Sequence, residues 1–397
     1  MSSQPSGGCI GIALLGAGSI AEYHLAGIAA VVDESDAAGK DATCSAAAAA
    51  VAAAAAGVVG RGNDVSASNA RVQARDKVHA KVRVIAARSA ARATPLAARF
   101  GVRDVVTDWR AVLDRSDVDA VVICTPDDTH EALAIAVADA GKAILLQKPM
   151  AGTVDACMRI IAAAERAGVD LQVSFMHRHF PEVEQARAWL TEGVIGRVHS
   201  VSIRNATPGP DWGDWFYSKA NVTGGVVDQL GVHGIDLALH LVGDIDEVSA
   251  RATTLRPTRT LRDGRVVRVE TPDTACATYG FDNGAMAVHE MSMIEMKGCD
   301  RFRLELYGDA GTMWLRSERG PLAVYAPARF GDEWHCPALE AAPFGQSHHR
   351  AWLEGVAGVA PKLATARDAL RGMQVVEAIR RSSAARGAAV TVDGAWR

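Results

Sequence analysis

The chain has 397 residues, of which 49% are hydrophobic and 22% charged, and this suits two folded domains of ordinary composition. Its 42 basic and 46 acidic residues give a formal net charge of −4 without a lysine or arginine block, which argues against nucleic acid as a partner. Seven scattered cysteines without a CxxC pair argue against disulfides and zinc, and the N-terminus lacks a secretory signal pattern. The alanine-rich stretch 45–59 is too short and too weakly apolar to span a membrane. We therefore expect a cytoplasmic protein without membrane contact.

After a flexible tail (residues 1–8), short apolar segments alternate with helical patterns as far as residue 149. Strands are expected at 9–15, 82–87, 119–124 and 143–146, and helices at 20–30, 91–100, 109–113 and 129–140. Gly101 and Gly141 follow two of these helices, as C-terminal caps do. The alternation predicts a doubly wound parallel sheet, a Rossmann domain over residues 9–149.

Residues 31–80 interrupt this alternation, because a helix-to-strand connection usually has only a few residues. The segment contains ten alanines among the eleven positions 46–56, preceded by Ser45 and followed by Gly57. A short polyalanine helix is marginal alone. We interpret the segment as a surface insertion, and a tolerated loop is favoured over a specific role.

From residue 150 the pattern changes to longer helices, at 154–167 and 181–192, and to a series of strands. The strands are expected at 198–204, 248–255, 266–270, 274–281, 285–291 and 301–306. This series predicts an α+β domain over residues 150–397 with a large, mostly antiparallel open sheet.

The turn Gly16-Ala17-Gly18-Ser19-Ile20-Ala21 connects the first strand to the first helix. Gly16 allows a tight turn, Gly18 lets the backbone approach a pyrophosphate, and Ala21 keeps helix and strand close. Backbone N–H groups at the helix start, including those of Ser19 and Ile20, then bind the phosphates. A merely structural turn is the alternative, but the β-α-β context favours dinucleotide binding.

The second strand ends in Ala87-Arg88-Ser89, with no carboxylate to bind the ribose hydroxyls of NAD. Arg88 and Ser89 therefore favour NADP over NAD, while a surface arginine beside a helix start is the alternative.

Two further strand ends face the expected ligand crevice. One carries Thr125, Pro126 and His130, and the other carries Gln147 and Lys148. A lysine here can stabilise a forming alkoxide, although it can also be a solvated charge. His130 fits either a place in the cofactor site or packing at its helix start.

Gln229, His233 and Asp236 fall on one face of a regular helix, which is polar within an apolar run. His233 is a candidate general base, and a buried histidine bonded to Asp236 is an equal alternative. A metal site with His240 is disfavoured because no further ligand joins at suitable spacing, so no metal is expected.

Several segments in order resemble the Gfo/Idh/MocA oxidoreductase family, named for glucose-fructose oxidoreductase and inositol dehydrogenase. They are GAGSIAEYH from Gly16, CTPDDTH, the QKP triplet, HRHFP from His177, GGVVDQLGVHGID from Gly224, and YGDAGTMWL from Tyr307. The resemblance implies a Rossmann domain followed by a substrate domain whose open sheet often mediates oligomerisation, here as a homodimer or homotetramer. It also implies a sugar, cyclitol or related polyhydroxylated substrate, with Lys148 orienting the reacting oxygen and His233 taking its proton.

Two departures from the family pattern matter. Its usual Glu-Lys-Pro is Gln147-Lys148-Pro149 here, and the acid expected four residues before the histidine is Gln229, with Asp228 one place earlier. One residue turns a helix by about 100°, so either Asp228 reaches the site through a local irregularity or Gln229 only binds substrate. Both residues are kept as candidates.

The substrate itself is not identified by the sequence. Arg178, Trp215 and Asp236 are candidate contacts, and packing or surface roles explain them equally well. The leading hypothesis is an NAD(P)-dependent dehydrogenase or reductase. A catalytically silent sugar- or cofactor-binding regulator and a redox-assisted lyase or glycosidase are the alternatives.

Overall fold

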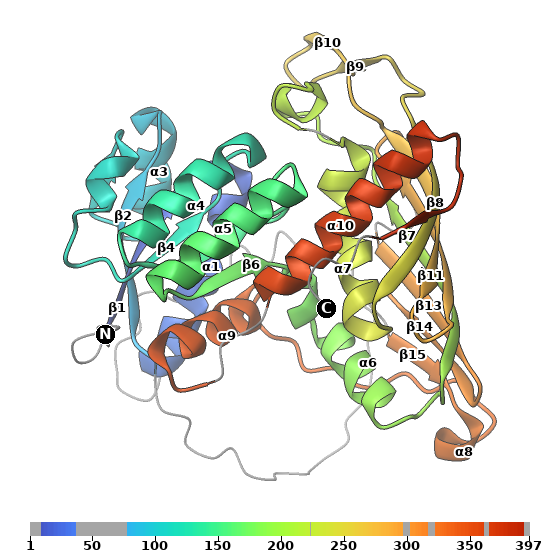
Figure 1. The fold of residues 1–397 in the computed structure, drawn as a ribbon. Helices are drawn as coiled ribbons and strands as arrows, with labels where there is room; N and C mark the ends of the chain where they lie inside the picture. The colour runs from blue at the N-terminus through green and yellow to red at the C-terminus, as the bar shows by residue number, and fades with distance from the viewer. Residues whose placement is uncertain are drawn as a thin grey trace.

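The computed structural model describes residues 9–36, 78–222, 224–296, 302–316, 322–360 and 365–392. Two sheets dominate it, and Figure 1 shows them side by side with helix α10 (Thr365–Ala384) crossing between them. The expectations for residues 37–77, including the alanine-rich stretch, lie outside the described residues. No helix in the described part is long and apolar enough to cross a membrane.

The first sheet is parallel and has the strand order β3-β2-β1-β4-β5-β6. The four expected strands are present, which confirms the Rossmann fold. Its strands are β1 (Ile10–Leu15), β2 (Ala80–Ala86), β3 (Asp104–Val106), β4 (Ala120–Ile123), β5 (Ala143–Gln147) and β6 (Leu171–Ser174). β1 and β4 are buried at every position, as expected for central strands covered on both faces.

Helices cover both faces of this sheet. Alternate strand residues pack on α1 (Ser19–Asp36), α3 (Ala90–Arg99) and α9 (Gln346–Ala357) on one face, and on α4 (His130–Asp139) and α5 (Val154–Ala167) on the other. The Thr153 hydroxyl accepts a hydrogen bond from the Ala156 N–H and starts α5, and Gly168, with φ 67°, ends it.

The parallel sheet continues beyond residue 149, the domain boundary expected from the sequence. α5 and β6 add one more crossover, so the helix at 154–167 belongs to the first layer system. Helix α9 returns near the C-terminus to pack on α1, and its Trp352 is fully buried in the first core. The first sheet and its covering helices are therefore completed by segments beyond residue 149.

The second sheet has eight strands in the order β15-β14-β13-β7-β12-β11-β8-β16. All pairs are antiparallel except β7 with β12, which confirms the expected mostly antiparallel sheet. The strands are β7 (Val198–Ala206), β8 (Ile245–Thr253), β11 (Thr274–Phe281), β12 (Met286–Ser292), β13 (Phe302–Gly308), β14 (Gly311–Leu315), β15 (Leu322–Tyr325) and β16 (Val390–Thr391).

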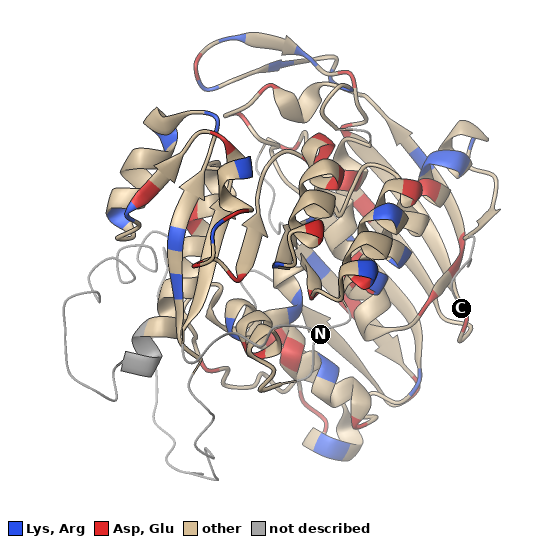
Figure 2. Ribbon diagram, turned by 60° about the vertical axis from the view of Figure 1, so that its left-hand side comes forward, with Lys and Arg blue, Asp and Glu red and all other residues tan. Residues whose placement is uncertain are grey.

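Helices α6 (Pro181–Thr191), α7 (Val232–Leu241) and α10 lie on the side of this sheet that faces the first domain (Figure 1). The expected strand at 266–270 forms instead a separate two-stranded hairpin, β9 (Thr258–Thr260) with β10 (Val266–Arg268). A short helix α8 (Pro327–Phe330) follows β15. Basic and acidic residues alternate along the helices of the ribbon in Figure 2, in line with their near balance in the sequence.

Candidate active site

The glycine-rich turn has the geometry that a dinucleotide needs. Gly16 has φ 109°, and a Cβ atom there would lie 2.6 Å from the Cys124 carbonyl oxygen, so only glycine fits. A Cβ on Gly18 would meet no atom within 4 Å, so this backbone is open to a ligand. Helix α1 begins at Ser19 directly behind the turn, and Ala21 is fully buried against the sheet. These residues fit a pyrophosphate held at a helix N-terminus.

The end of β2 presents Arg88 and Ser89 at the surface. Both residues are exposed, and Ser89 is the N-cap residue of α3. Because β2 lies next to β1 in the sheet, Arg88, just after the end of β2, lies at the strand end next to the glycine-rich turn. This is where the ribose of a dinucleotide is expected.

The ends of β4 and β5 are joined by His130, the first residue of α4. Its Nδ1 lies 2.9 Å from the Pro149 carbonyl oxygen, and its Nε2 lies 3.0 Å from the Thr125 carbonyl oxygen. The side chain is fully buried, and burial lowers its pKa. Both ring nitrogens thus face backbone carbonyl oxygens at the ends of β4 and β5, which fits the packing role of His130.

Lys148, directly after β5, lies among polar groups from both halves of the chain. Its Nζ donates a hydrogen bond of 2.9 Å to the Gln229 carbonyl oxygen. The Gln229 side-chain amide donates in turn to a carboxylate oxygen of Asp127, at 2.6 Å. Lys148 is half-buried.

Asp127, in the 3₁₀ turn η2 (Asp127–Thr129), is a member of this cluster that sequence reasoning missed. Burial raises its pKa to about 7, and the nearby Asp228 carboxylate adds to the rise, while Lys148 and Gln229 oppose it. The signal for Asp127 was its place in the segment CTPDDTH at a strand end. The cluster therefore contains a carboxyl group that titrates near neutrality.

The polar helix does not have the regular geometry expected from the sequence. A π-helical turn, η5 (Val227–Gly231), precedes α7, so the chain has one extra residue in this turn. The shared face expected for Gln229, His233 and Asp236 assumed a regular helix. His233 and Asp236 do lie in the regular helix α7, but Gln229 lies in the π-helical turn, so its place on that face is corrected. In a π-helical turn the backbone bonds run from residue i to i+5 instead of i+4. The residue five places before His233 therefore takes the position that the residue four places before, Gln229, would have in an α-helix.

That residue is Asp228, whose side chain is 1% exposed. Its two oxygens accept hydrogen bonds from one Arg380 nitrogen at 2.7 and 2.6 Å, and one also accepts from the Gly224 N–H at 2.8 Å. Burial raises the pKa of Asp228, and Arg380 and then Lys148 oppose this rise. The carboxylate therefore lies within electrostatic reach of Lys148, through the local irregularity that the sequence left open.

Arg178 and Asp236, candidate substrate contacts, are instead bonded to each other. The guanidinium contacts both Asp236 oxygens, with distances of 2.5 to 3.1 Å, and also Asp368 at 2.6 Å. Their side chains are 8% and 2% exposed, so this is a structural ion pair between η3 (Met176–His179) and α7. Asp236 is thus the partner of Arg178, and the alternative of a histidine bonded to Asp236 is replaced by a buried arginine pair.

His233 itself stacks on His177, with ring centroids 4.2 Å apart. Phe302 closes the pair edge-on, and both histidines are almost fully buried. His177 was not singled out from the sequence, although HRHFP follows the end of β6 at the same sheet edge. Trp215 lies in the 3₁₀ turn η4 (Trp215–Tyr217) and stacks on Phe216 at 3.7 Å.

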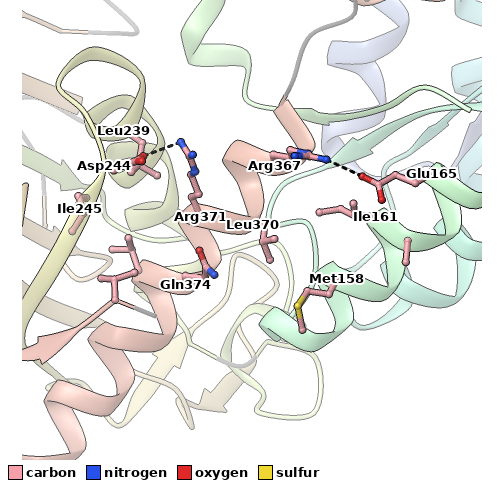
Figure 3. Close-up of a pocket in the computed structure, with 13 residues that line it drawn as sticks. Met158, Ile161, Glu165, Leu239, Asp244, Ile245, Arg367, Leu370, Arg371 and Gln374 are labelled. Carbon is pink, nitrogen blue, oxygen red and sulfur yellow. Dashed lines mark hydrogen bonds and ion pairs between the residues drawn. The ribbon is translucent and has the colours of Figure 1, made fainter. Parts of the chain in front are cut away.

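A separate pocket lies between α5, α7 and α10, with a volume of about 150 Å³. Figure 3 shows its apolar walls and two ion pairs, Arg367 with Glu165 and Arg371 with Asp244. It contains none of the candidate site residues. Within the described residues no group of three potential metal ligands is present, including around His233 and His240.

Comparisons with known proteins give a consistent result. Residues 55–175 match the family model "Oxidoreductase family, NAD-binding Rossmann fold", and residues 183–314 match "GFO/IDH/MocA C-terminal domain". Inositol 2-dehydrogenase 2 of Saccharopolyspora erythraea is 35% identical over 72% of this chain and 80% of its own length. Levoglucosan dehydrogenase of Pseudarthrobacter phenanthrenivorans is 30% identical over 60% of this chain, and the match spans 65% of that relative.

Solved structures show the same fold. A levoglucosan dehydrogenase in complex with NADH and levoglucosan superposes with a TM-score of 0.79 at 23% identity, covering 97% of this chain and all of that one.

Proposed function

We propose that this chain, which belongs to the Gfo/Idh/MocA family of oxidoreductases, is an NAD(P)-dependent dehydrogenase or reductase acting on a CH–OH group of a polyhydroxylated compound. The observation that carries the proposal is the hydrogen bond from Lys148 to Gln229, in the π-helical turn that leads into α7 and His233, on a fold whose glycine turn has an open backbone at Gly18. The named relatives act on inositol and levoglucosan, so a cyclitol or sugar derivative is the proposed substrate class.

In this proposal Lys148 and His233 carry the acid-base chemistry. Lys148 exchanges its bond to the Gln229 carbonyl oxygen for one to the substrate oxygen and stabilises negative charge there. His233 accepts the hydroxyl proton in oxidation and returns it in reduction. A bound nicotinamide supplies the hydride acceptor or donor.

Asp228 takes the place of the family's acid in this proposal. The π-helical turn supports the assignment, because it compensates for the extra residue between Asp228 and His233. Gln229 then positions Lys148 through its backbone and Asp127 through its side chain.

The phosphates are assigned to Gly16, Gly18, Ser19 and Ile20, and the nicotinamide end to Thr125, Pro126 and Gln147 together with Lys148. NADP is the preferred cofactor because exposed Arg88 can bind a 2′-phosphate at the end of β2. Replacement Arg88→Ala should raise the Kd for NADPH at least tenfold and leave that for NADH within twofold. An equal effect on both cofactors would remove this preference.

The direct test is a fluorescence titration with NADH and NADPH, followed by a turnover screen of polyols, aldoses, cyclitols and sugar acids. Binding of at least one cofactor and reduction of NAD or NADP by at least one substrate are expected. Cofactor binding without turnover on any substrate would favour the silent regulator, and product formation without net cofactor reduction would favour a redox-assisted lyase or glycosidase.

We further propose a cytoplasmic homodimer or homotetramer that assembles through the open face of the second sheet. Met286 and Val288 on β12 and Trp334 beyond β15 are exposed there. Light scattering of the wild-type chain and of a Val288→Lys variant measures this assembly.

A further inference from the structure

A buried row of three side chains connects the Lys148 strand end to helices α1 and α9. It consists of Gln147, the last residue of β5, His24 on α1 and His349 on α9. Gln147 is 5% exposed, and both histidines are fully buried. The catalytic proposal above uses neither histidine.

The amide of Gln147 can be oriented without ambiguity. Its Oε1 lies 2.8 Å from the Lys148 backbone nitrogen, which can only donate, so this atom is the amide oxygen. The amide NH₂ therefore points to Nε2 of His24, 3.1 Å away. Because an amide NH₂ can only donate, this ring nitrogen of His24 carries no proton.

The proton positions then follow along the row. A neutral His24 has its proton on Nδ1, which lies 2.9 Å from Nε2 of His349 and donates to it. His349 in turn has its proton on Nδ1, which lies 2.7 Å from the Gly345 carbonyl oxygen, a group that can only accept. Every link has one donor and one acceptor when both rings are neutral and protonated on Nδ1.

The surroundings favour these neutral rings. Burial lowers the pKa of both His24 and His349, and each ring is flanked by other aromatic groups. Tyr23 on α1 packs edge-on against His24, and its hydroxyl lies 3.0 Å from Nδ1 of His348. The ring of His179 on η3 packs against that of His348, and His179 further disfavours positive charge on His349.

Glu182 on α6 lines the adjacent pocket with His179 and His348. Among the described residues, Tyr23, His348, His179 and Glu182 are thus titratable groups near the row, and Lys148 follows Gln147 in the chain.

We propose that Gln147, His24 and His349 form a charge-neutral hydrogen-bonded chain of fixed direction, and that Gln147 acts in it as a positioning residue for Lys148. The chain binds the strand end that bears Lys148 to the helix behind the phosphate turn and to the start of α9. Its direction requires a donor at position 147, where the family usually has a carboxylate.

The substitution Gln147→Glu tests this direction because an ionised carboxylate can only accept. Without an added proton every link would reverse, and Nδ1 of His349 would face the Gly345 carbonyl with lone pair against lone pair. The folded variant therefore takes up one proton, either on the carboxyl group, which donates to His24, or on His24, which donates to the carboxylate. The unfolded variant does not hold this proton above pH ~5, since free glutamate has a pKa of about 4.3.

The experiment compares unfolding of the wild type, Gln147→Glu, Gln147→Met and Gln374→Glu between pH 5.5 and 8.5. The folded Gln147→Glu variant holds one proton that its unfolded state does not. Its unfolding constant, divided by that of the wild type, should therefore rise about tenfold for each unit by which the pH is raised. Gln147→Met has no titrating group at position 147, and Gln374→Glu places the same charge at a half-buried position of α10. The unfolding constant of each of these two variants, divided by that of the wild type, should therefore stay constant with pH. A constant ratio for Gln147→Glu would overturn the proposal.

A second measurement, on the wild type alone, tests the direction of the hydrogen-bonded chain even if Gln147→Glu does not fold. Neutron diffraction of the wild type should show deuterium on Nδ1, and none on Nε2, of both His24 and His349. Deuterium on Nε2 of either ring would overturn the fixed direction.

The positioning part rests on the proposed role of Lys148 and has its own readout. With a substrate from the turnover screen, kcat of Gln147→Glu relative to the wild type should be constant with pH wherever its stability ratio slopes, because the folded variant keeps its added proton there. Gln147→Met can bond neither to His24 nor to the Lys148 N–H, so its kcat should fall at least tenfold with KM unchanged within twofold. A wild-type kcat in folded Gln147→Met would overturn positioning of Lys148. Failure of the wild type to turn over any substrate would count against the proposed function, while the unfolding and diffraction results would still decide the direction of the chain.

Discussion

The substitution Asp228→Asn probes the carboxylate that the π-helical turn brings toward Lys148. Asp228 is almost fully buried and accepts two hydrogen bonds from Arg380 and one from Gly224. An asparagine keeps the shape but replaces one acceptor oxygen with an NH₂ group, which then faces a donor. The charge that neutralises Arg380 is also lost.

The size of the effect follows from the geometry. Breaking a fully buried ion pair costs about 3–5 kcal/mol, but Arg380 is 25% exposed and water screens part of its charge, so we expect about 2–3 kcal/mol. For a chain of this length the entropy of unfolding is about 0.8 kcal/mol per kelvin, and the melting temperature should fall by about 3–4 °C. The variant therefore remains folded at 25 °C and can be assayed.

The assay measures kcat and cofactor Kd for Asp228→Asn and for the neighbouring Gln229→Leu. Loss of a carboxylate that assists proton transfer should lower kcat of Asp228→Asn by about 10²-fold. Gln229→Leu removes the side-chain bond to Asp127 but keeps the backbone bond to Lys148, so its kcat should fall less than tenfold. A wild-type kcat in Asp228→Asn with a large loss in Gln229→Leu would refute the assignment.

Three further predictions concern the cofactor turn, the buried arginine and Asp127. Gly18→Val should fill the open space over the turn and raise the Kd for dinucleotide more than tenfold without lowering the melting temperature, whereas Gly16→Ala should lower the melting temperature because of its positive φ and the nearby Cys124 oxygen. Arg178→Met should destabilise the fold by about 3–5 kcal/mol in chemical denaturation, and Asp236→Leu added to it should restore part of this loss; no restoration would contradict a buried pair. The pKa of Asp127 is raised to about 7, so its protonated form stabilises the fold; this contribution is complete below pH ~4 and is lost as pH rises through 7. Asp127→Asn should therefore abolish an inflection near pH 7 in stability or cofactor affinity. An unchanged inflection would exclude Asp127 as its source.

Local patterns in the sequence predict much of this fold. The apolar runs of β1, β4 and β5 and the glycine that follows each of α3 and α4 are signals carried by neighbouring residues. They are sufficient to predict the phosphate turn and the place of Lys148 at a strand end.

Features that depend on distant contacts were not predictable in the same way. Helix α9 covers one face of the first sheet from late in the chain, with Trp352 buried there, and Arg178 pairs with Asp236 across 58 positions of sequence. The π-helical turn inverted the expected facing of Asp228 and Gln229, because a single extra residue shifts a helix by about 100°. His177 and Asp127 entered the site for the same reason, since their importance comes from neighbours in space.

The central claim is that His233 and Lys148 perform proton transfer for hydride exchange with a bound nicotinamide. It is tested most directly by following nicotinamide absorbance during turnover of a polyhydroxylated substrate by the wild type, His233→Ala and Lys148→Met, with cofactor Kd measured on the same preparations. The account predicts a loss of kcat of at least about 10²-fold in each variant, with Kd for the cofactor unchanged within a few-fold in His233→Ala. Wild-type turnover by His233→Ala would contradict it.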